Sequence, residues 1–196
     1  MRLRCLISDL DGTLFYTEEA NYAAYRRAFG ELGFTVSEEA YNRAFGLRLD
    51  DMVRAVAPGF SPEKLPILKH KKTAYYRQAV DLIRANRPLI EFLRSMKGTL
   101  PIALATTASR ANAGMILDHF SVRDLFDVTV FGEDVMRGKP DPECYDICIR
   151  RCAVAPEECL VFEDSEVGVQ AALAAGARVL LIPPGWRSLS PQGSAS

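Results

Sequence analysis

Residues 4–14 read Arg-Cys-Leu-Ile-Ser-Asp-Leu-Asp-Gly-Thr-Leu, and this stretch decides how the rest of the chain is interpreted. Its short apolar run, over residues 4–10, predicts a buried strand, because strands of parallel sheets are covered on both faces. Two aspartates, Asp9 and Asp11, stand where that strand ends, and Gly12 follows them. Asp-Gly is also a common turn, so these residues alone do not indicate a function.

Four further apolar runs have the length of buried strands. They occupy residues 101–107, 127–132, 159–164 and 177–183. The segments between them have helical length and period, and they occupy residues 109–119, 141–153 and 165–175. Asp141 as N-cap with Pro142 at the first helical position predicts where the second helix begins, and Gly176 predicts where the third ends. Strands that alternate with such helices predict an α/β fold with a parallel sheet covered on both faces.

About seventy residues separate Leu14 from a helix predicted over residues 87–97, and they contain no convincing strand. Their periodicity predicts helices at residues 18–32, 37–45, 50–56 and 62–83, the second of which begins at Ser37. An all-helical insert after the first strand would be a lid at the carboxyl edge of the sheet. We therefore expect a catalytic core made of residues 1–14 and 85–196, and a helical cap made of residues 15–84.

The composition narrows the class of protein. The chain has 196 residues, 48% of them apolar, which is enough for one packed domain or one domain with a small insert. With 24 basic and 25 acidic residues the net charge is -1, so neither a nucleic-acid polymer nor a membrane is an expected partner. No apolar run approaches the roughly 20 residues of a membrane span. The apolar stretch before Asp9 is interrupted by Arg4 and is too short for a signal peptide, so we expect a cytoplasmic protein.

The five cysteines are an odd number for a chain of this size, which argues against a disulfide framework. Three of them, Cys144, Cys148 and Cys152, recur every four residues. A zinc site is one interpretation, although structural zinc sites favour closer cysteine pairs with further ligands nearby. The other interpretation, which we favour, is a buried helix face shared with Tyr145 and Ile149.

Polar residues worth naming fall where the predicted strands end, and open parallel sheets bind their ligands at that edge. These residues form the fragments Asp9-Leu10-Asp11-Gly12-Thr13, Thr106-Thr107, Gly138-Lys139-Pro140 and Glu163-Asp164-Ser165. Each fragment alone has a structural explanation, since Asp-Gly forms turns, threonine suits strands, Lys-Pro suits loops and Glu-Asp caps helices. Those explanations do not account for the convergence of all the fragments on one edge.

Four of these residues are acidic, namely Asp9, Asp11, Glu163 and Asp164. Like charges a few Å apart cannot all stay ionised unless something positive lies between them. A hard divalent cation with oxygen ligands meets this need, and Mg2+ keeps positions open for water and phosphate. We therefore expect Mg2+ as the cofactor, held by these carboxylates.

The other residues at this edge suit a phosphate group. Lys139 supplies a fixed positive charge, and Thr106 offers a hydroxyl donor with Thr107 beside it. Gly12 allows backbone N–H groups to approach an anion closely. The set is suited to phosphoryl transfer, in which positioning and charge neutralisation account for most of the catalysis.

The same fragments, in the same order along the chain, resemble the four motifs of haloacid dehalogenase-like hydrolases. The resemblance covers nearly the whole chain, including the helical insert and the small residues after the last acidic pair. Those small residues are Gly168, Ala171, Ala172, Ala175 and Gly176. The resemblance is closest to the branch of beta-phosphoglucomutase and phosphoglycolate phosphatase. It implies a Rossmann-like parallel sheet core of about five strands, with a helical cap inserted after the first strand.

The resemblance also implies a role for each acidic residue. Asp9 resembles the nucleophile that becomes phosphorylated, and its carboxylate also binds Mg2+. Asp11 resembles the general acid and base, with its backbone carbonyl on the metal, and its presence argues against dehalogenases and phosphonatases. Asp164 resembles the third metal ligand, with Glu163 nearby or binding through water.

The phosphate binders implied by the resemblance are Lys139, which we count with the catalytic residues, and Thr106. In this family the cap closes over the phosphate and selects the leaving group. Three cap residues are candidates for binding the substrate, namely Asn21, Arg48 and Lys72. Each of them could equally be a solvated surface side chain.

We expect a Mg2+-dependent phosphatase that hydrolyses a small phosphorylated metabolite through an aspartyl phosphate, as a monomer. Sugar phosphates, phosphoglycolate and nucleotide monophosphates all remain possible substrates. The first alternative is a mutase similar to beta-phosphoglucomutase, but Asn21 stands where that branch has a histidine. Leu49 stands where the branch has an arginine, and Arg48 is one residue away. The second alternative is a non-catalytic binding module, which would gain nothing from so much buried negative charge.

Overall fold

A computed structural model describes residues 2–44 and 49–183 of the chain. The chain divides into two compact units. One unit comprises Met1–Tyr16 together with Arg84–Ser196, and the other comprises Thr17–Ile83. Each unit is described separately below. Within the described residues, no helix combines the length and the apolarity that crossing a bilayer requires.

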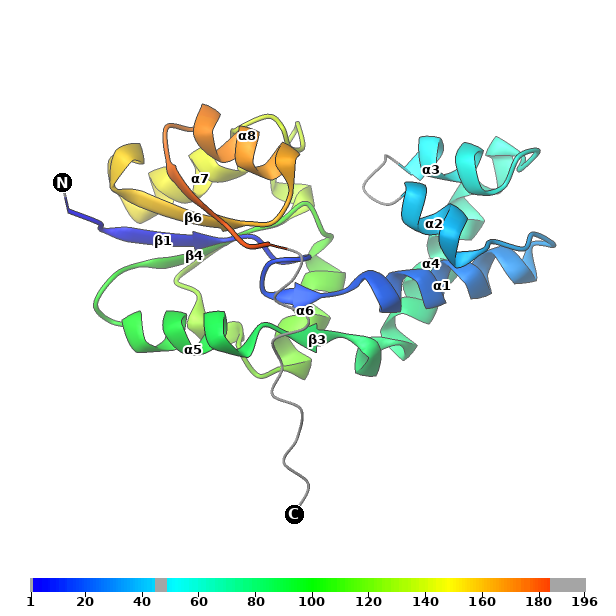
Figure 1. Cartoon of the computed structure of the whole chain (residues 1–196), viewed down its shortest axis with the longest axis horizontal. Helices are drawn as coiled ribbons and strands as arrows, with labels where there is room; N and C mark the ends of the chain where they lie inside the picture. Colours follow the sequence, from blue (N-terminus) through cyan, green and yellow to red (C-terminus); the bar gives the residue numbers. More distant parts are fainter. Residues whose placement is uncertain (1, 45–48, 184–196) are drawn as a thin grey trace, which may run out of the picture. The chain divides into compact units, whose positions relative to one another are not determined.

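The first unit is built on a parallel sheet of five strands in the order β5-β4-β1-β6-β7 (Figure 1). The strands are β1 (Cys5–Ser8), β4 (Ile102–Ala105), β5 (Val128–Val130), β6 (Cys159–Glu163) and β7 (Arg178–Leu181). The predicted α/β class and all five predicted strands are confirmed, each strand being shorter at its ends than its apolar run. Because β1 pairs in parallel with both β4 and β6, the carboxyl ends of these three strands lie at one edge of the sheet.

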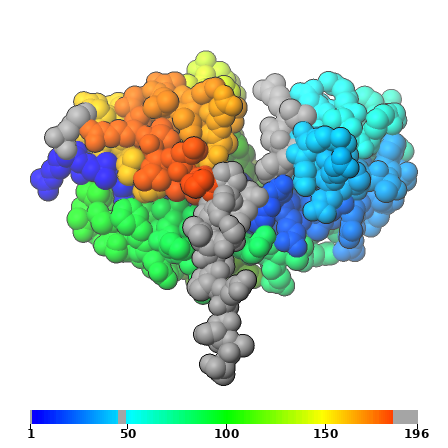
Figure 2. All heavy atoms as spheres, viewed as in Figure 1, coloured from blue at the N-terminus to red at the C-terminus, as the bar shows by residue number. Residues whose placement is uncertain are grey.

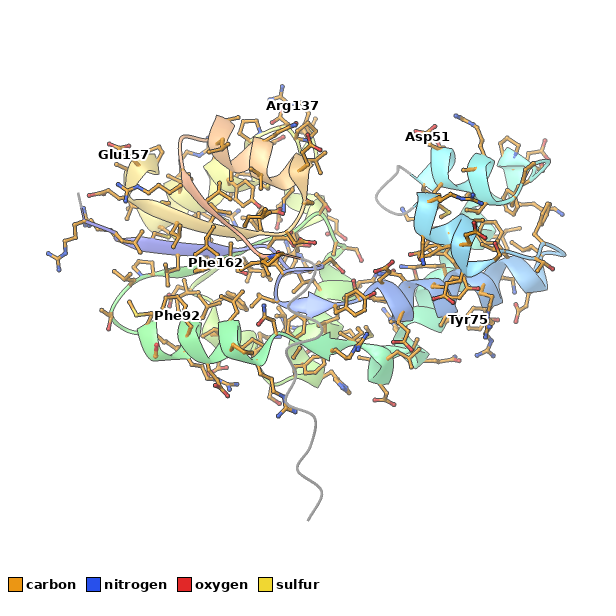
Figure 3. All side chains as sticks on the ribbon, in the orientation of Figure 1. Asp51, Tyr75, Phe92, Arg137, Glu157 and Phe162 are labelled. Atoms are coloured by element: carbon orange, nitrogen blue, oxygen red, sulfur yellow. The ribbon has the colours of Figure 1, made fainter. Side chains whose placement is uncertain are left out.

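Helices cover both faces of this sheet. They are α5 (Arg87–Met96), α6 (Arg110–His119), α7 (Glu143–Cys152) and α8 (Glu166–Ala174). Figure 1 shows α7 and α8 on one face and α5 on the other. Phe92 of α5 contacts Phe162 of β6 with ring centroids 5.9 Å apart (Figure 3). Strand β1 is fully buried. The space-filling view shows the residues of α8 and β7, in orange, and of α5, in green, on the surface of this unit (Figure 2).

The three regularly spaced cysteines lie on a buried face of α7. Cys144 and Cys148 lie in the core with Tyr145 and Ile149, and Cys152 is half-buried beside them. All five cysteines of the chain are free thiols. Burial raises the pKa of Cys144 to about 11, so this thiol stays protonated at neutral pH. The interpretation as a buried helix face is confirmed.

Short 3-10 turns and one small ribbon complete the first unit. The turns are η3 (Arg123–Leu125), η4 (Gly132–Asp134) and η5 (Pro156–Glu158). The ribbon pairs β2 (Phe15–Tyr16) antiparallel with β3 (Arg84–Ala85). The expectation of no strand between Leu14 and the helix at residues 87–97 is therefore wrong, because strands of two residues are too short to carry an alternating pattern.

Helix α7 begins one residue later than predicted. Pro142 is the residue that precedes its first turn, and the side chain of Asp141 accepts a hydrogen bond from the backbone N–H of Glu143 at 3.1 Å. The predicted end of α8 is confirmed, because Gly176 follows the helix with a φ of 79°. Ser109 caps α6 by accepting a hydrogen bond from the backbone N–H of Asn112.

The second unit is all-helical. Its helices are α1 (Glu18–Glu31), α2 (Glu38–Ala44), α3 (Leu49–Val56) and α4 (Leu65–Gln78), with 3-10 turns η1 (Pro62–Lys64) and η2 (Val80–Leu82). Helices α1 and α4 pack along each other, and the core is rich in aromatic rings such as Phe29 and Phe60, whose centroids are 5.5 Å apart. Arg27 lies over the ring of Tyr75, which is labelled in Figure 3.

The single helix predicted over residues 62–83 is wrong, since the structure divides this segment into η1, α4 and η2. Pro66 stands in the first turn of α4 and has no backbone N–H to extend a helix from Pro62. At the other end the N–H of Ala79 is shared between the carbonyls of Tyr75 and Tyr76, which tightens the last turn. Helical periodicity does not reveal either change of hydrogen-bond pattern.

Candidate functional site

The loop after β1 brings the first acidic residues to the carboxyl edge of the sheet. Asp9 is 6% exposed, and its backbone N–H donates to the carbonyl of Phe162 in β6 at 3.0 Å. Gly12 has a φ of 87°, in the left-handed region that glycine favours. A Cβ atom at Gly12 would collide with the carboxylate of Asp164. Glycine is therefore required for the loop after β1 to approach the end of β6.

Lys139 lies between two of the predicted acidic residues. Its Nζ is 2.6 Å from Asp9 Oδ1 and 2.5 Å from Glu163 Oε1, and it also donates to the carbonyl of Ala105 at 3.5 Å. The side chain of Lys139 is only 7% exposed. Burial alone would lower the pKa of Lys139, but the negative charges around it, Asp9 foremost, outweigh burial and raise it. The ammonium therefore stays charged.

A tight loop holds Lys139 in this position. The carboxylate of Glu143, in the first turn of α7, accepts from the backbone N–H groups of Met136 at 3.1 Å and Arg137 at 2.8 Å. The N–H of Asp141 donates to the carbonyl of Gly138 at 3.1 Å and closes the loop around Lys139. The hydrogen bonds from Met136 and Arg137 lower the pKa of Glu143, so its carboxylate is ionised at neutral pH.

Glu163 is 1% exposed, and both of its carboxylate oxygens accept hydrogen bonds. Oε1 accepts from Lys139 and, at 2.9 Å, from the hydroxyl of Tyr145. Oε2 accepts from the backbone N–H groups of Asp164 and Ser165 and from the Ser165 hydroxyl, at 2.9, 2.9 and 3.0 Å. Burial would raise the pKa of Glu163, but Lys139 and the other donors lower it. This carboxylate is ionised and is surrounded by protein donors.

Asp9 and Asp164 hold their protons more strongly than free aspartates do. Burial raises the pKa of Asp9 well above its usual value, with a partial offset from Lys139 and a further rise from Glu163 and Asp11. Burial also raises the pKa of Asp164 to about 6, although the hydroxyl of Thr13 donates to Asp164 Oδ1 at 3.0 Å. One ammonium does not balance these carboxylates, so the site favours a further cation.

The donor chemistry of the site fits Mg2+. Among the residues that the structure describes, no three carboxylate, imidazole or thiol groups are already arranged around a common metal position. Mg2+ does not require such a set, because one or two carboxylates hold it while water and phosphate oxygens complete its shell. Asp9 and Asp164, with the backbone carbonyl of Asp11, could supply these hard oxygens. Glu163 has both of its oxygens engaged by protein donors.

The predicted phosphate binders lie at two of the strand ends. Thr106 is buried at the end of β4, where its Oγ1 accepts from the N–H of Ala108 at 3.0 Å. It directly follows Ala105, whose carbonyl contacts Lys139. Thr107 is exposed. The structure thus places Thr106 directly after the residue whose carbonyl contacts the lysine, and it leaves the side chain of Thr107 exposed.

The candidate cap residues belong to the other unit. Asn21 Nδ2 donates to the carbonyl and the hydroxyl oxygen of Thr17, at 3.1 and 3.3 Å. Lys72 Nζ lies over the rings of Tyr76 and Tyr25, 4.2 and 5.2 Å from their centroids. Lys72 is therefore half-buried against aromatic rings rather than fully solvated. Arg48 lies outside the described residues.

Sequence reasoning missed several residues that hold the site together. The sequence pattern places Tyr145 on the buried face of α7. A buried tyrosine usually needs a partner for its hydroxyl, and this requirement indicates a polar contact. Asn86 caps α5 by accepting from Leu89 N–H at 3.3 Å and donates to the carbonyl of Thr13 at 3.0 Å. Its place before Arg87-Pro88 is a helix-start signal that would have found it.

Substitution of Gly168 should disturb the site through Glu163. A Cβ atom at Gly168 would overlap the Glu163 carboxylate, so Gly168→Ala must move either that carboxylate or α8. We expect a loss of roughly 1–3 kcal/mol in the free energy of unfolding, together with lower activity. Gly30→Ala is the matched control, because a Cβ atom there meets nothing within 4 Å, and it should add about 0.5–1 kcal/mol. Urea unfolding of both variants tests this, and equal stabilities would contradict the assigned contact.

A parallel sheet with acidic side chains and a buried lysine gathered at its carboxyl edge is the architecture of an α/β enzyme. The chain belongs to the haloacid dehalogenase-like hydrolases, since the model of that family matches residues 6–182. The resemblance drawn from the motifs is thereby confirmed.

Two sequence relatives and one solved structure support the same family. The phosphorylated carbohydrates phosphatase of Thermotoga maritima is 34% identical over 181 residues, which are 89% of this chain and 82% of that protein. The fructose-1-phosphate phosphatase of Escherichia coli is 31% identical over 173 residues, which are 87% of this chain and 92% of that protein. The crystal structure of CbbY from Rhodobacter sphaeroides in complex with phosphate matches with a TM-score of 0.84 and 26% identity, over 98% of this chain and 92% of that one.

Proposed function

We propose that this chain is a Mg2+-dependent phosphatase that hydrolyses a small phosphorylated carbohydrate through a phosphorylated Asp9. The observation that carries the proposal is the buried Lys139 ammonium, 2.6 Å from Asp9 Oδ1 and 2.5 Å from Glu163 Oε1. A carboxylate held against a fixed cation at the end of a central strand suits nucleophilic attack on phosphorus, because the cation offsets the repulsion between two anions.

The proposed mechanism assigns one task to each residue. Asp9 attacks the phosphorus, and Asp11 protonates the leaving alcohol and then removes a proton from the attacking water. Lys139 and Thr106 orient the phosphate oxygens, and Glu163 holds Lys139 in place. Bound Mg2+, held by Asp9, Asp164 and the backbone carbonyl of Asp11, would neutralise phosphate charge.

The substrate class follows from the relatives. Two of them are named as phosphatases of phosphorylated carbohydrates and of fructose 1-phosphate. We propose that this chain acts on the same class of compound. The proposal assigns catalysis to the unit that contains Asp9, and it assigns a part in substrate choice to Asn21 and Lys72 of the helical unit.

The chain should release inorganic phosphate from an aryl phosphate only when Mg2+ is present. The cation is needed because burial and mutual repulsion raise the pKa values of Asp9 and Asp164 in its absence. Phosphate release should stop in excess chelator and return when Mg2+ is restored, and fructose 1-phosphate and other sugar phosphates should turn over faster than the aryl ester. Undiminished turnover in chelator would contradict the proposal.

Water should be the main phosphoryl acceptor rather than a sugar hydroxyl. A mutase must shield its aspartyl phosphate from water until the right sugar is bound. Asn21, at the position where the mutase branch has histidine, is neutral, and its amide donates to Thr17 within the first turn of its own helix. With beta-glucose 1-phosphate and a trace of the bisphosphate, inorganic phosphate should form faster than glucose 6-phosphate. The reverse order of rates would favour the mutase.

A further inference from the structure

Tyr145 touches both members of the buried ion pair, Lys139 and Glu163. Its side chain is fully buried in α7. The hydroxyl donates to Glu163 Oε1 at 2.9 Å, and the face of the ring lies 4.9 Å from Lys139 Nζ. Tyr145 therefore contacts both members of the ion pair through one side chain.

The position of the ammonium depends on two competing carboxylates. Nζ is 2.6 Å from Asp9 and 2.5 Å from Glu163, and only the contact with Asp9 faces the proposed reaction. Glu163 Oε1 accepts from Lys139 and from Tyr145 at the same time. An oxygen that serves two donors holds each of them less strongly than an oxygen that serves one. The hydroxyl of Tyr145 therefore limits how far Glu163 draws the ammonium away from Asp9.

The ring of Tyr145 adds a second constraint. A cation over an aromatic face is attracted by the ring, and Lys139 Nζ lies over the ring of Tyr145, 4.9 Å from its centroid. Glu163 cannot rotate to follow, because its other oxygen is fixed by the backbone N–H groups of Asp164 and Ser165. The ring and the hydroxyl together restrict the position of the Lys139 ammonium.

We propose that Tyr145 is a positioning residue for Lys139, which keeps the ammonium against Asp9 by sharing Glu163 Oε1 and by supporting the cation with its ring. The inference rests on the proposed phosphatase function, in which Lys139 orients the phosphate and steadies the nucleophile. The contacts of Tyr145 at this site are with Glu163 and Lys139, so we assign it a role that acts through the two residues of the ion pair.

Tyr145→Phe is the decisive variant, because it keeps the ring and removes only the hydroxyl. The ammonium should shift towards Glu163, and a misplacement of this kind lowers turnover by about 10- to 100-fold. The kcat should fall while KM for a sugar phosphate changes less than about threefold, since Thr106 and the backbone still bind the phosphate.

A loss of core stability alone would produce a different pattern. Cys148→Ala is the matched control, because Cys148 is also fully buried on α7 and its thiol donates to the carbonyl of Leu104, at 3.6 Å, and not to the ion pair. This variant should lower the melting temperature with a kcat within about twofold of the unmodified chain. A fall in kcat for Cys148→Ala equal to that of Tyr145→Phe would overturn the positioning role.

A crystal structure of Tyr145→Phe provides a readout that does not depend on activity. We expect the distance from Lys139 Nζ to Asp9 Oδ1 to lengthen from 2.6 Å to beyond about 3.5 Å, with the contact to Glu163 retained. An unmoved ammonium would overturn the inference whatever the kcat. If the unmodified chain hydrolyses no phosphate ester with Mg2+, the proposed function fails, and the lysine position in the variant still decides the role of Tyr145.

Discussion

Asp9→Asn should lose turnover on the order of 10^6-fold, the scale observed when a catalytic nucleophile is removed. An amide neither forms the acyl phosphate nor binds a cation as a carboxylate does. The fold should persist, because the amide oxygen can still accept from Lys139. The variant should melt no lower than the unmodified chain at neutral pH, since burial disfavours the ionised Asp9 and raises its pKa.

The test of this prediction pairs an activity assay with a melting curve. Asp124→Asn makes the same chemical change at an exposed residue of the same unit, where the carboxylate is 82% exposed, and it should leave kcat unaltered. Mass spectrometry should verify that the amide has not hydrolysed back to aspartate. If intact Asp9→Asn keeps more than a few per cent of activity, the nucleophile is another residue.

Lys139→Met should be the most destabilising single change at the site. The substitution keeps the apolar length of the side chain but leaves Asp9 and Glu163 buried without their counter-ion. Removing one partner of a buried ion pair costs roughly 3–5 kcal/mol in the free energy of unfolding. Turnover should also fall steeply, because neither Asp9 nor Glu163 can offset the negative charge of an arriving phosphate.

The loss of stability in Lys139→Met should depend on pH. Lys139 lowers the pKa of Glu163, and a lowered pKa stabilises the fold above the unfolded pKa and loses this effect as pH falls through the folded value. The difference from the unmodified chain should therefore be largest near neutral pH and shrink as the pH falls below about 4.5. Urea unfolding at several pH values measures it.

A second lysine provides the control for that experiment. Lys97→Met removes an ammonium that is 40% exposed and pairs with Asp124 on the surface, so its cost should stay below about 1 kcal/mol at every pH. A loss in Lys139→Met that is equally small, or that does not change with pH, would show that the ammonium does not neutralise the buried carboxylates.

Much of the fold could be predicted because its determinants are local. The five buried strands are short apolar runs between turn residues, and their alternation with helices leaves a parallel sheet as the natural arrangement. That topology alone brings Asp9 and Glu163 to one edge of the sheet, because Asp9 follows β1 and Glu163 ends the neighbouring strand β6. The break at Pro66 and the ribbon at Phe15–Tyr16 escaped prediction, because a helix boundary and a pair of two-residue strands leave almost no periodic trace.

The site could be predicted from the sequence less completely than the strands. Glu163 was expected among the metal ligands, yet the donors on its two oxygens include backbone N–H groups, which no side-chain pattern announces. The prediction placed Tyr145 on the buried face of α7 and assigned no partner to its hydroxyl, which donates to Glu163 Oε1. Which of two plausible partners a charged group selects depends on side-chain rotation and distance, and these follow from packing rather than from spacing.

The order of the strands also has a consequence for synthesis on the ribosome. Strand β1 is made first, but it pairs with β4, whose register begins at Ile102, and with β6, whose register begins at Cys159. The nucleophile candidate Asp9 and its counter-ion Lys139 are 130 positions apart in the chain, and the Glu163 that anchors this lysine emerges later still. A nascent chain therefore carries its central strand unpaired on one side until β6 has left the exit tunnel, so the site can assemble only after β6 has emerged.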